Sequence, residues 1–113
     1  MRKIDLTPFN VKAMRDEEFV EAPYMLRDSM AGALFVPGLN LGALGLLRNN
    51  KIAEKILFCE SNTLLLEEDE YSALRAGFET ATGFRQTDVE MVRRVMEAPV
   101  VEVIEKPVED TPS

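Results

Sequence analysis

The chain of 113 residues contains no histidine. Histidine is the commonest general base at neutral pH, the usual partner of a catalytic serine or cysteine, and the commonest metal ligand. Its absence removes one essential member from most hydrolase mechanisms. We therefore expect no catalytic residue, no metal site and no cofactor, and we predict that the protein is not an enzyme.

Cysteine is also scarce, because Cys59 is the only one. No disulfide can form within the chain, so folding does not need an oxidising compartment. Cys59 follows Ile56 and Leu57 on the apolar side of a predicted helix. This position favours a small core residue over a nucleophile.

Basic residues are in the minority. Thirteen Lys and Arg residues stand against twenty Asp and Glu residues, which gives a net charge of -7. A negative field repels phosphate backbones and anionic lipid surfaces, so nucleic acid is not an expected direct partner. The local cluster of Arg85, Arg93 and Arg94 opposes this trend, and ordinary helix-end and surface charges are the simpler interpretation.

Long apolar runs without interruption are missing. The longest uncharged run, residues 29–47, contains Pro37 and four glycines, which favours two helices meeting at a turn over a membrane span. The basic start of the chain is typical of a signal peptide, but Asp5 and Pro8 interrupt the apolar run that should follow. We expect no membrane association.

The N-terminal part predicts strands. Residues 3–6 have an extended pattern, and apolar and polar residues alternate over residues 9–14 as in a half-buried strand. Residues 15–18 form a polar turn, and residues 19–22 return as the second strand of a hairpin. The turn lacks the Asn-Gly or Asp-Gly pair that specifies the tightest hairpins.

Helices are predicted next. Pro23 suits the first turn of a helix that runs to Leu34 and stops before Pro37. A second helix spans residues 39–59 with a bend at Asn49-Asn50, and residues 63–66 form a short link to the next helix. The glycines at positions 42 and 45 indicate a close approach of another backbone.

Two further helices complete the predicted domain. Residues 67–70 are four carboxylates that suit the positive end of a helix dipole. Gly83 is placed to take a left-handed conformation after that helix, with Phe84 folding back on its last turn. Thr87 and Glu90 have capping-box spacing for the last helix, which ends before Pro99.

These patterns predict an α+β fold that is mainly α with a small N-terminal β-hairpin. Residues 1–98 form one compact domain of about four helices, and residues 99–113 form an acidic, proline-containing C-terminal tail that extends as an arm. Residues 101–104 have the composition of a strand. We expect this tail to be the protein interface, through Pro99, Val101, Val103, Ile104, Pro107 and Val108.

The order of these pieces is similar to a family of short tailed-bacteriophage virion and assembly proteins. The resemblance covers residues 3–98 and depends on short motifs, namely Lys3-Ile4-Asp5-Leu6, Leu26-Arg27-Asp28, Ala53-Glu54-Lys55-Ile56, Leu65-Leu66-Glu67-Glu68 and Val92-Arg93-Arg94-Val95. The chain departs from the family pattern at residues 38–45 and at the turn after Met14. The resemblance implies a phage-encoded, non-enzymatic protein and identifies no binding residue.

The expected function is therefore that of a phage structural or assembly protein that works in many copies, in the virion or the host cytoplasm. Its partners would be proteins, either further copies in a homo-oligomer or other phage structural proteins. Two alternatives stay open. One is a small acidic inhibitor of a host or anti-phage defence protein, with residues 67–70 and the tail imitating phosphates. The other is a tail assembly chaperone that is absent from the mature particle.

Overall fold

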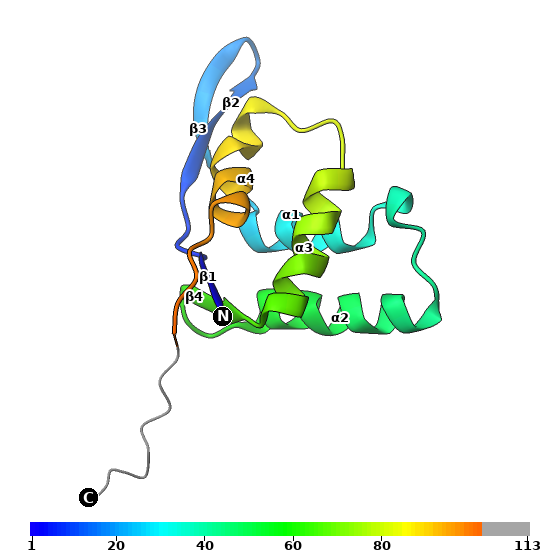
Figure 1. Cartoon of the computed structure of the whole chain (residues 1–113). Helices are drawn as coiled ribbons and strands as arrows, with labels where there is room; N and C mark the ends of the chain where they lie inside the picture. The colour runs from blue at the N-terminus through cyan, green and yellow to red at the C-terminus, as the bar shows by residue number, and fades with distance from the viewer. Residues whose placement is uncertain (103–113) are drawn as a thin grey trace, which may run out of the picture.

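The computed structural model describes residues 1–102, apart from the side chain of Arg15, and confirms the predicted fold class. Within these residues the chain forms four α-helices, three short 3-10 turns and two antiparallel strand pairs (Figure 1). In chain order the elements are β1 (Arg2–Asp5), β2 (Asn10–Arg15), β3 (Glu18–Pro23), α1 (Leu26–Gly32), η1 (Ala33–Phe35), η2 (Pro37–Leu39), α2 (Ala43–Phe58), β4 (Thr63–Leu66), α3 (Glu68–Thr80), η3 (Gln86–Asp88) and α4 (Val89–Met96).

The first strand pair joins two distant parts of the sequence. β1 pairs antiparallel with β4, so that Arg2 lies opposite Leu66 and Asp5 opposite Thr63. The prediction that residues 63–66 are only a link is wrong, because a pairing between such distant segments leaves no local sequence signal. On the other edge of β1, the Lys3 N–H donates to the Pro99 carbonyl at 3.0 Å.

The second strand pair is the predicted hairpin, formed by β2 and β3. Its turn places Asp16 at φ 53° and Glu17 at φ 66°, the two positive angles that a tight hairpin turn requires. The prediction that Pro23 opens a helix is wrong. Pro23 is the last residue of β3, opposite Asn10, where a strand at the edge of a sheet tolerates the missing N–H.

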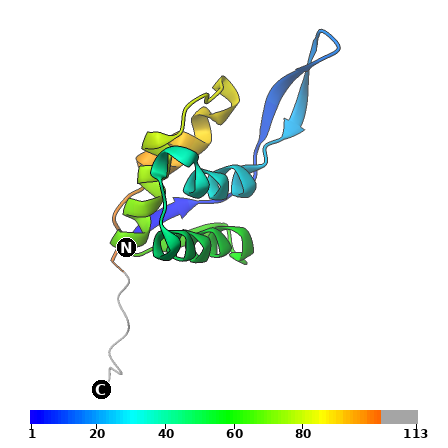
Figure 2. The same ribbon diagram turned by 90° about the vertical axis from the view of Figure 1, so that its right-hand side faces the viewer.

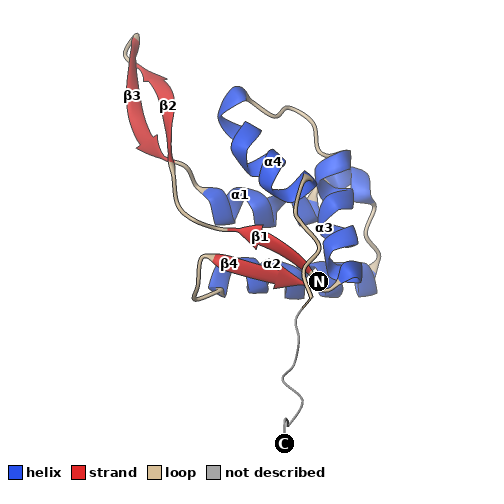
Figure 3. Cartoon of the chain, turned by 60° about the vertical axis from the view of Figure 1, so that its left-hand side comes forward, coloured by secondary structure: helices blue, strands red, loops and turns tan. Residues whose placement is uncertain are grey.

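The hydrophobic core lies between the helices and the β1–β4 pair, which together we call the helical body. Figure 3 shows β1 and β4 against the helices, whereas the hairpin extends away from them. The fully buried large apolar side chains come from β1 and the residue after it, from β4 and η1, and from all four helices. They are Ile4, Leu6, Met30, Leu34, Ile52, Ile56, Leu66, Leu74 and Val95. One core therefore connects both ends of the described chain.

Among the glycines, Gly77 in α3 has the closest backbone neighbour. A Cβ atom built there would overlap the carbonyl oxygen of Ala33 in η1. The prediction placed this approach at Gly42 and Gly45, and it is wrong. Gly42 has open space around it and Gly45 meets only the nearby Leu41, because the start of α2 faces solvent.

The helix α2 is continuous, so the predicted bend at Asn49-Asn50 is wrong. The Asn49 side chain is buried, and its Nδ2 donates to the Leu34 carbonyl at 2.8 Å. This bond satisfies the buried amide without a break in the helix. At the other end of α2, Arg27 from α1 donates to the carbonyls of Ile56 and Cys59 and so caps the helix C-terminus.

The predicted ends of α3 are confirmed. Its first turn carries the acidic residues, and the Glu70 carboxylate accepts the Glu67 N–H at 3.0 Å, which caps the helix. Beyond the helix, Gly83 takes a left-handed φ of 82°. The Phe84 ring then stacks on Phe78 in the last turns of the helix, with 5.9 Å between the ring centroids.

The predicted capping box of the last helix is wrong. The 3-10 turn η3 precedes α4, and there the Asp88 carboxylate accepts the Arg85 N–H at 2.8 Å. Glu90 instead binds the side chains of two arginines in its own helix. Met91 and Val95 form the buried side of α4, whereas Val89 is exposed.

Candidate interaction surfaces

The predicted tail interface is only partly within the described residues. Pro99 and Val101 lie in it. The Pro99 carbonyl accepts the Lys3 N–H of β1, and the Val101 N–H donates to the Met1 carbonyl at 2.8 Å. Backbone hydrogen bonds to the start of the chain therefore hold both residues. The other four predicted interface residues lie outside the described residues, and they are Val103, Ile104, Pro107 and Val108.

The arginine cluster has a largely structural explanation. The Arg94 side chain is 11% exposed, and it donates to Glu90 and to the carbonyls of Asp5 and Thr7. Arg93 also donates to Glu90. Hydrogen bonds from Arg93 and then Arg94 hold the pKa of the Glu90 carboxyl below its usual range. Two of the three arginines thus hold α4 together or fasten it to the chain after β1.

The acidic cluster of residues 67–70 is partly neutralised. Glu68 pairs with Arg2 at 3.0 Å, and Glu70 pairs with Lys55 of α2. Arg2 also donates to the Ala98 carbonyl at 2.9 Å and lies over the Tyr71 ring. These contacts connect α3 to β1 and α2, so the cluster serves packing as well as the helix dipole.

The base of the hairpin is anchored by Tyr24. Its ring stacks on Phe9 with 5.1 Å between centroids, and its hydroxyl donates to the Asp88 carboxylate at 2.5 Å. Burial and the hydrogen bond to Asp88 raise the pKa of Tyr24 to about 12. The hairpin is therefore attached to the helical body at one end, while its turn extends beyond all the helices (Figure 2).

The remaining candidate features are the single cysteine, groups of metal-binding side chains and membrane-spanning helices. Cys59 is half-buried and packs against the core, as predicted for a small core residue. Over residues 1–102, no three His, Cys, Asp or Glu side chains gather as they would around a metal ion. The helices in the same part of the chain are too short or too polar to cross a membrane.

A mixed apolar and basic surface runs along α2. We call it the α2 face, and its residues recur every three or four positions on the side away from the core: Leu44, Leu47, Arg48, Lys51, Lys55 and Phe58. Leu44 is 83% exposed and Phe58 is 73% exposed. Two shallow hollows of about 470 and 530 Å³ share Lys51 and Glu54, so the face is continuous over the length of the helix.

A second apolar surface lies on the hairpin. Met14 and Phe19 face each other across the two strands, and they are 64% and 69% exposed. Lys12 and Glu21 are the next pair on the same side, and we call these four residues the hairpin face. The turn beside it is acidic, and residues 16–18 form what we call the acidic tip.

Sequence reasoning missed both surfaces. The strand prediction assumed that one side of the hairpin is half-buried, which Val11 and Ala13 confirm, but the other side also carries Met14 and Phe19. A strand with apolar residues on both sides is a signal for a second contact. Comparison with protein-family models, curated proteins and solved structures finds no match for this chain.

Proposed function

We propose that the protein is a non-enzymatic phage structural or assembly protein that acts in many copies through protein contacts. The observation that supports this most is the presence of large exposed apolar side chains on two separate elements, the hairpin and α2. Contiguous exposed apolar surface on a small protein is typical of an interaction site. Two such surfaces on one copy allow contacts with two neighbours.

Burial of the exposed apolar side chains in a complex is favourable in free energy. Burying one large apolar side chain stabilises a complex by about 1.5–3 kcal/mol. Leu44, Phe58 and Phe19 each expose more than half of their surface in the single chain. These side chains therefore provide a driving force for assembly that the single chain does not use.

The assignment to a phage rests on the resemblance over residues 3–98. The proposed location, in the virion or the host cytoplasm, rests on the same resemblance. The acidic inhibitor has less support, because Glu68 and Glu70 are already paired with Arg2 and Lys55. An assembly chaperone that leaves before the particle matures uses the same surfaces. It differs only in where the chain is found.

The proposed function is tested by mass spectrometry of purified particles of the encoding phage, compared with infected-cell lysate. We expect the chain in both samples, at many copies per particle. Detection only in lysate contradicts a virion protein. In that case, the identity of the proteins captured from lysate separates the alternatives. A phage structural protein indicates the assembly chaperone, and a host or defence protein indicates the inhibitor.

A further inference from the structure

The two exposed surfaces carry opposite charge. The segment Asn10–Pro23 has four carboxylates and two basic side chains. The helix Ala43–Phe58 has three basic side chains and one carboxylate, in a chain whose net charge is -7. The α2 face is therefore a basic exception in an acidic protein, and the acidic tip is a surface of complementary charge.

Several charges at the two surfaces form no ion pair among the side chains that the structure describes. The ion pairs leave out Arg48 and Lys51 on α2, and they leave out Glu17 at the acidic tip. In each surface these charges lie next to exposed apolar residues. Each surface therefore combines an apolar contact with charges that are available to another molecule.

The dimensions of the two surfaces also match. Each strand of the hairpin has six residues and spans about 20 Å. The sixteen residues of α2 span about 24 Å. The two-stranded ribbon and the α2 face are therefore of similar length.

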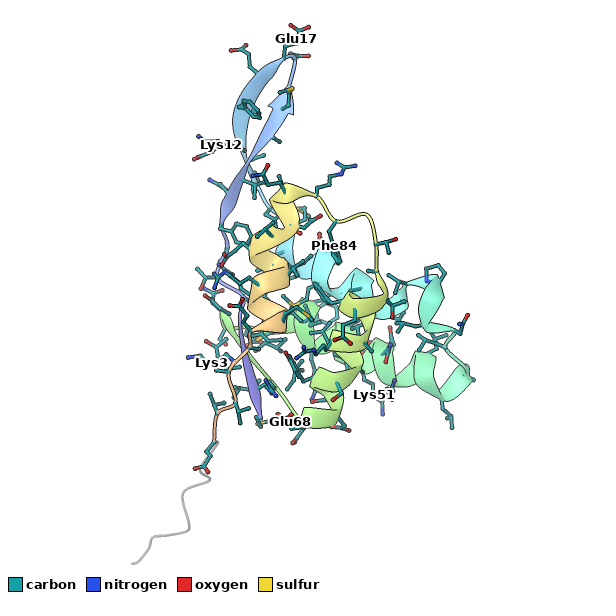
Figure 4. All side chains as sticks on the ribbon, turned by 45° about the horizontal axis from the view of Figure 1, so that its top comes forward. Lys3, Lys12, Glu17, Lys51, Glu68 and Phe84 are labelled. Carbon is teal, nitrogen blue, oxygen red and sulfur yellow. The ribbon has the colours of Figure 1, made fainter. Side chains whose placement is uncertain are left out.

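The two surfaces cannot meet within one chain. Figure 4 shows Glu17 at the far end of the hairpin and Lys51 at the opposite end of the molecule. The helical body lies between them and has a continuous core. A contact between the surfaces must therefore join two copies.

We propose that the hairpin face of one copy binds the α2 face of a second copy, with the acidic tip against Arg48 and Lys51. Met14 and Phe19 then cover Leu44 and Leu47. The pair keeps one free α2 face, on the first copy, and one free hairpin, on the second, so the association is heterologous and gives a ring or an open filament. This inference rests on the proposed function and names the partner as a second copy of the chain.

A contact of this size lies at the small end of specific interfaces. We therefore expect weak association through one such contact, with a dissociation constant roughly between micromolar and millimolar. The weight-average mass of the full-length protein should therefore rise at least about two-fold between micromolar and near-millimolar concentration at low salt. It should fall again at high salt, because the charged part of the contact is screened.

The test uses sedimentation of full-length variants. E17K/E18K changes the hairpin, R48E/K51E changes α2, and a third variant combines all four substitutions. The matched control E97K/E102K changes the charge by the same amount as the hairpin variant, on exposed residues outside both surfaces. Thermal unfolding of every variant checks that these exposed substitutions leave the fold intact.

We expect each two-residue variant alone to remain monomeric at the concentration where the unchanged protein associates. An equimolar mixture of the two variants should regain association and grow beyond a dimer, with the two variants in alternating order. The unchanged α2 face of one variant binds the unchanged hairpin of the other, and the two changed surfaces, a basic hairpin and an acidic α2 face, also match each other. The four-residue variant should associate like the unchanged protein, because both signs are reversed together.

The mixed pair identifies which surfaces meet. Two outcomes overturn the inference: a monomer at every concentration of the unchanged protein, or variants that associate as well as the control. A dimer that either variant forms alone also overturns it, because that result requires a contact between identical surfaces. If association fails while the chain is present in purified particles, the proposed function stands and only the second copy is rejected as the partner.

Discussion

The chain contains two antiparallel strand pairs whose surroundings are opposite. In β1–β4, Ile4 and Leu66 are completely buried against the helices. In β2–β3, Met14 and Phe19 are exposed by 64% and 69%. The local hydrogen bonding is the same in both pairs, so the difference comes from what each pair packs against. The first pair contributes to the core, and the second is attached only at its base.

The two strand pairs therefore have different roles: β1–β4 contributes to the stability of the fold, and β2–β3 provides a candidate contact surface. An isolated two-stranded hairpin is marginally stable in water and needs further packing. The helices supply that packing for β1–β4, while the outer half of β2–β3 has no such cover in the described part of the chain (Figure 3). Substitutions in the two pairs should therefore have different effects on folding.

The largest expected difference comes from matched truncations in the two pairs. Leu66→Ala removes a fully buried side chain, and we expect the free energy of unfolding to fall by about 3 kcal/mol. Phe19→Ala removes an exposed side chain, and we expect a change within about 0.5 kcal/mol. Chemical denaturation measures both values. Equal losses would mean that the hairpin belongs to the same packed unit.

The next prediction concerns the packing between η1 and α3 in the helical body. Gly77→Ala places a methyl group against the Ala33 carbonyl, and we expect a loss of about 2 kcal/mol. Gly32→Ala is the matched control, because it has helical angles and open space around it. There we expect a gain of up to about 1 kcal/mol. The opposite signs are read from thermal unfolding, and two losses of equal size would refute the close contact.

The anchor of the hairpin provides a third prediction. Tyr24→Phe keeps the ring that stacks on Phe9 but removes the hydroxyl that donates to Asp88. We expect a loss of about 1 kcal/mol, concentrated in the hairpin base. Hydrogen exchange should therefore accelerate at the amides of β2 and β3 and change little in β1 and β4. A uniform acceleration throughout the chain would show that Tyr24 supports the whole core.

A pH dependence follows from Glu90. Arg93 and Arg94 lower the pKa of the Glu90 carboxyl in the folded state. The ionised carboxylate therefore adds to the free energy of unfolding above the unfolded pKa, and this contribution is lost as the pH falls through the folded pKa. The pair is partly exposed, and the effect should be below about 1 kcal/mol. Glu90→Gln should remove this part of the acid sensitivity between neutral and acidic pH. If Glu90→Gln leaves the dependence of stability on pH unchanged, Glu90 does not contribute to the acid sensitivity.

The smallest expected effect is local to the hairpin turn. Glu17 has a φ of 66°, which glycine adopts without strain. Glu17→Gly should therefore stabilise the turn by roughly 0.5 kcal/mol. The change should appear in the exchange rates of the neighbouring strand amides and leave the thermal midpoint of the helical body unchanged. A slower exchange in β1 and β4 as well would contradict the separation of the two pairs.

Local signals predicted the parts of the fold that depend on neighbours in sequence. Residues 67–70, Gly83 and Phe84 marked the two ends of α3 correctly, because caps act within a few residues. The pairing of residues 63–66 with β1 was missed because the partner strand lies near the chain start. The close approach at Gly77 was missed because it depends on where η1 crosses α3.

The candidate surfaces could be predicted even less well. An exposed leucine and a buried leucine look the same in the sequence, and only the position of the core shows that Leu44 faces solvent while Leu66 does not. The prediction placed the interface in the tail, and four of its six residues lie outside the described part of the chain. The tail therefore stays a predicted interface, in addition to the hairpin face and the α2 face.

Hydrogen exchange at two protein concentrations tests the central claim most directly. At a dilution where the chain is monomeric, we expect the amides of β2 and β3 to exchange at least about ten-fold faster than those of β1 and β4. At a concentration where copies associate, the hairpin amides should become protected while the β1 and β4 amides stay unchanged. Hairpin amides that are as protected as those of β1 and β4 at every concentration would contradict the account.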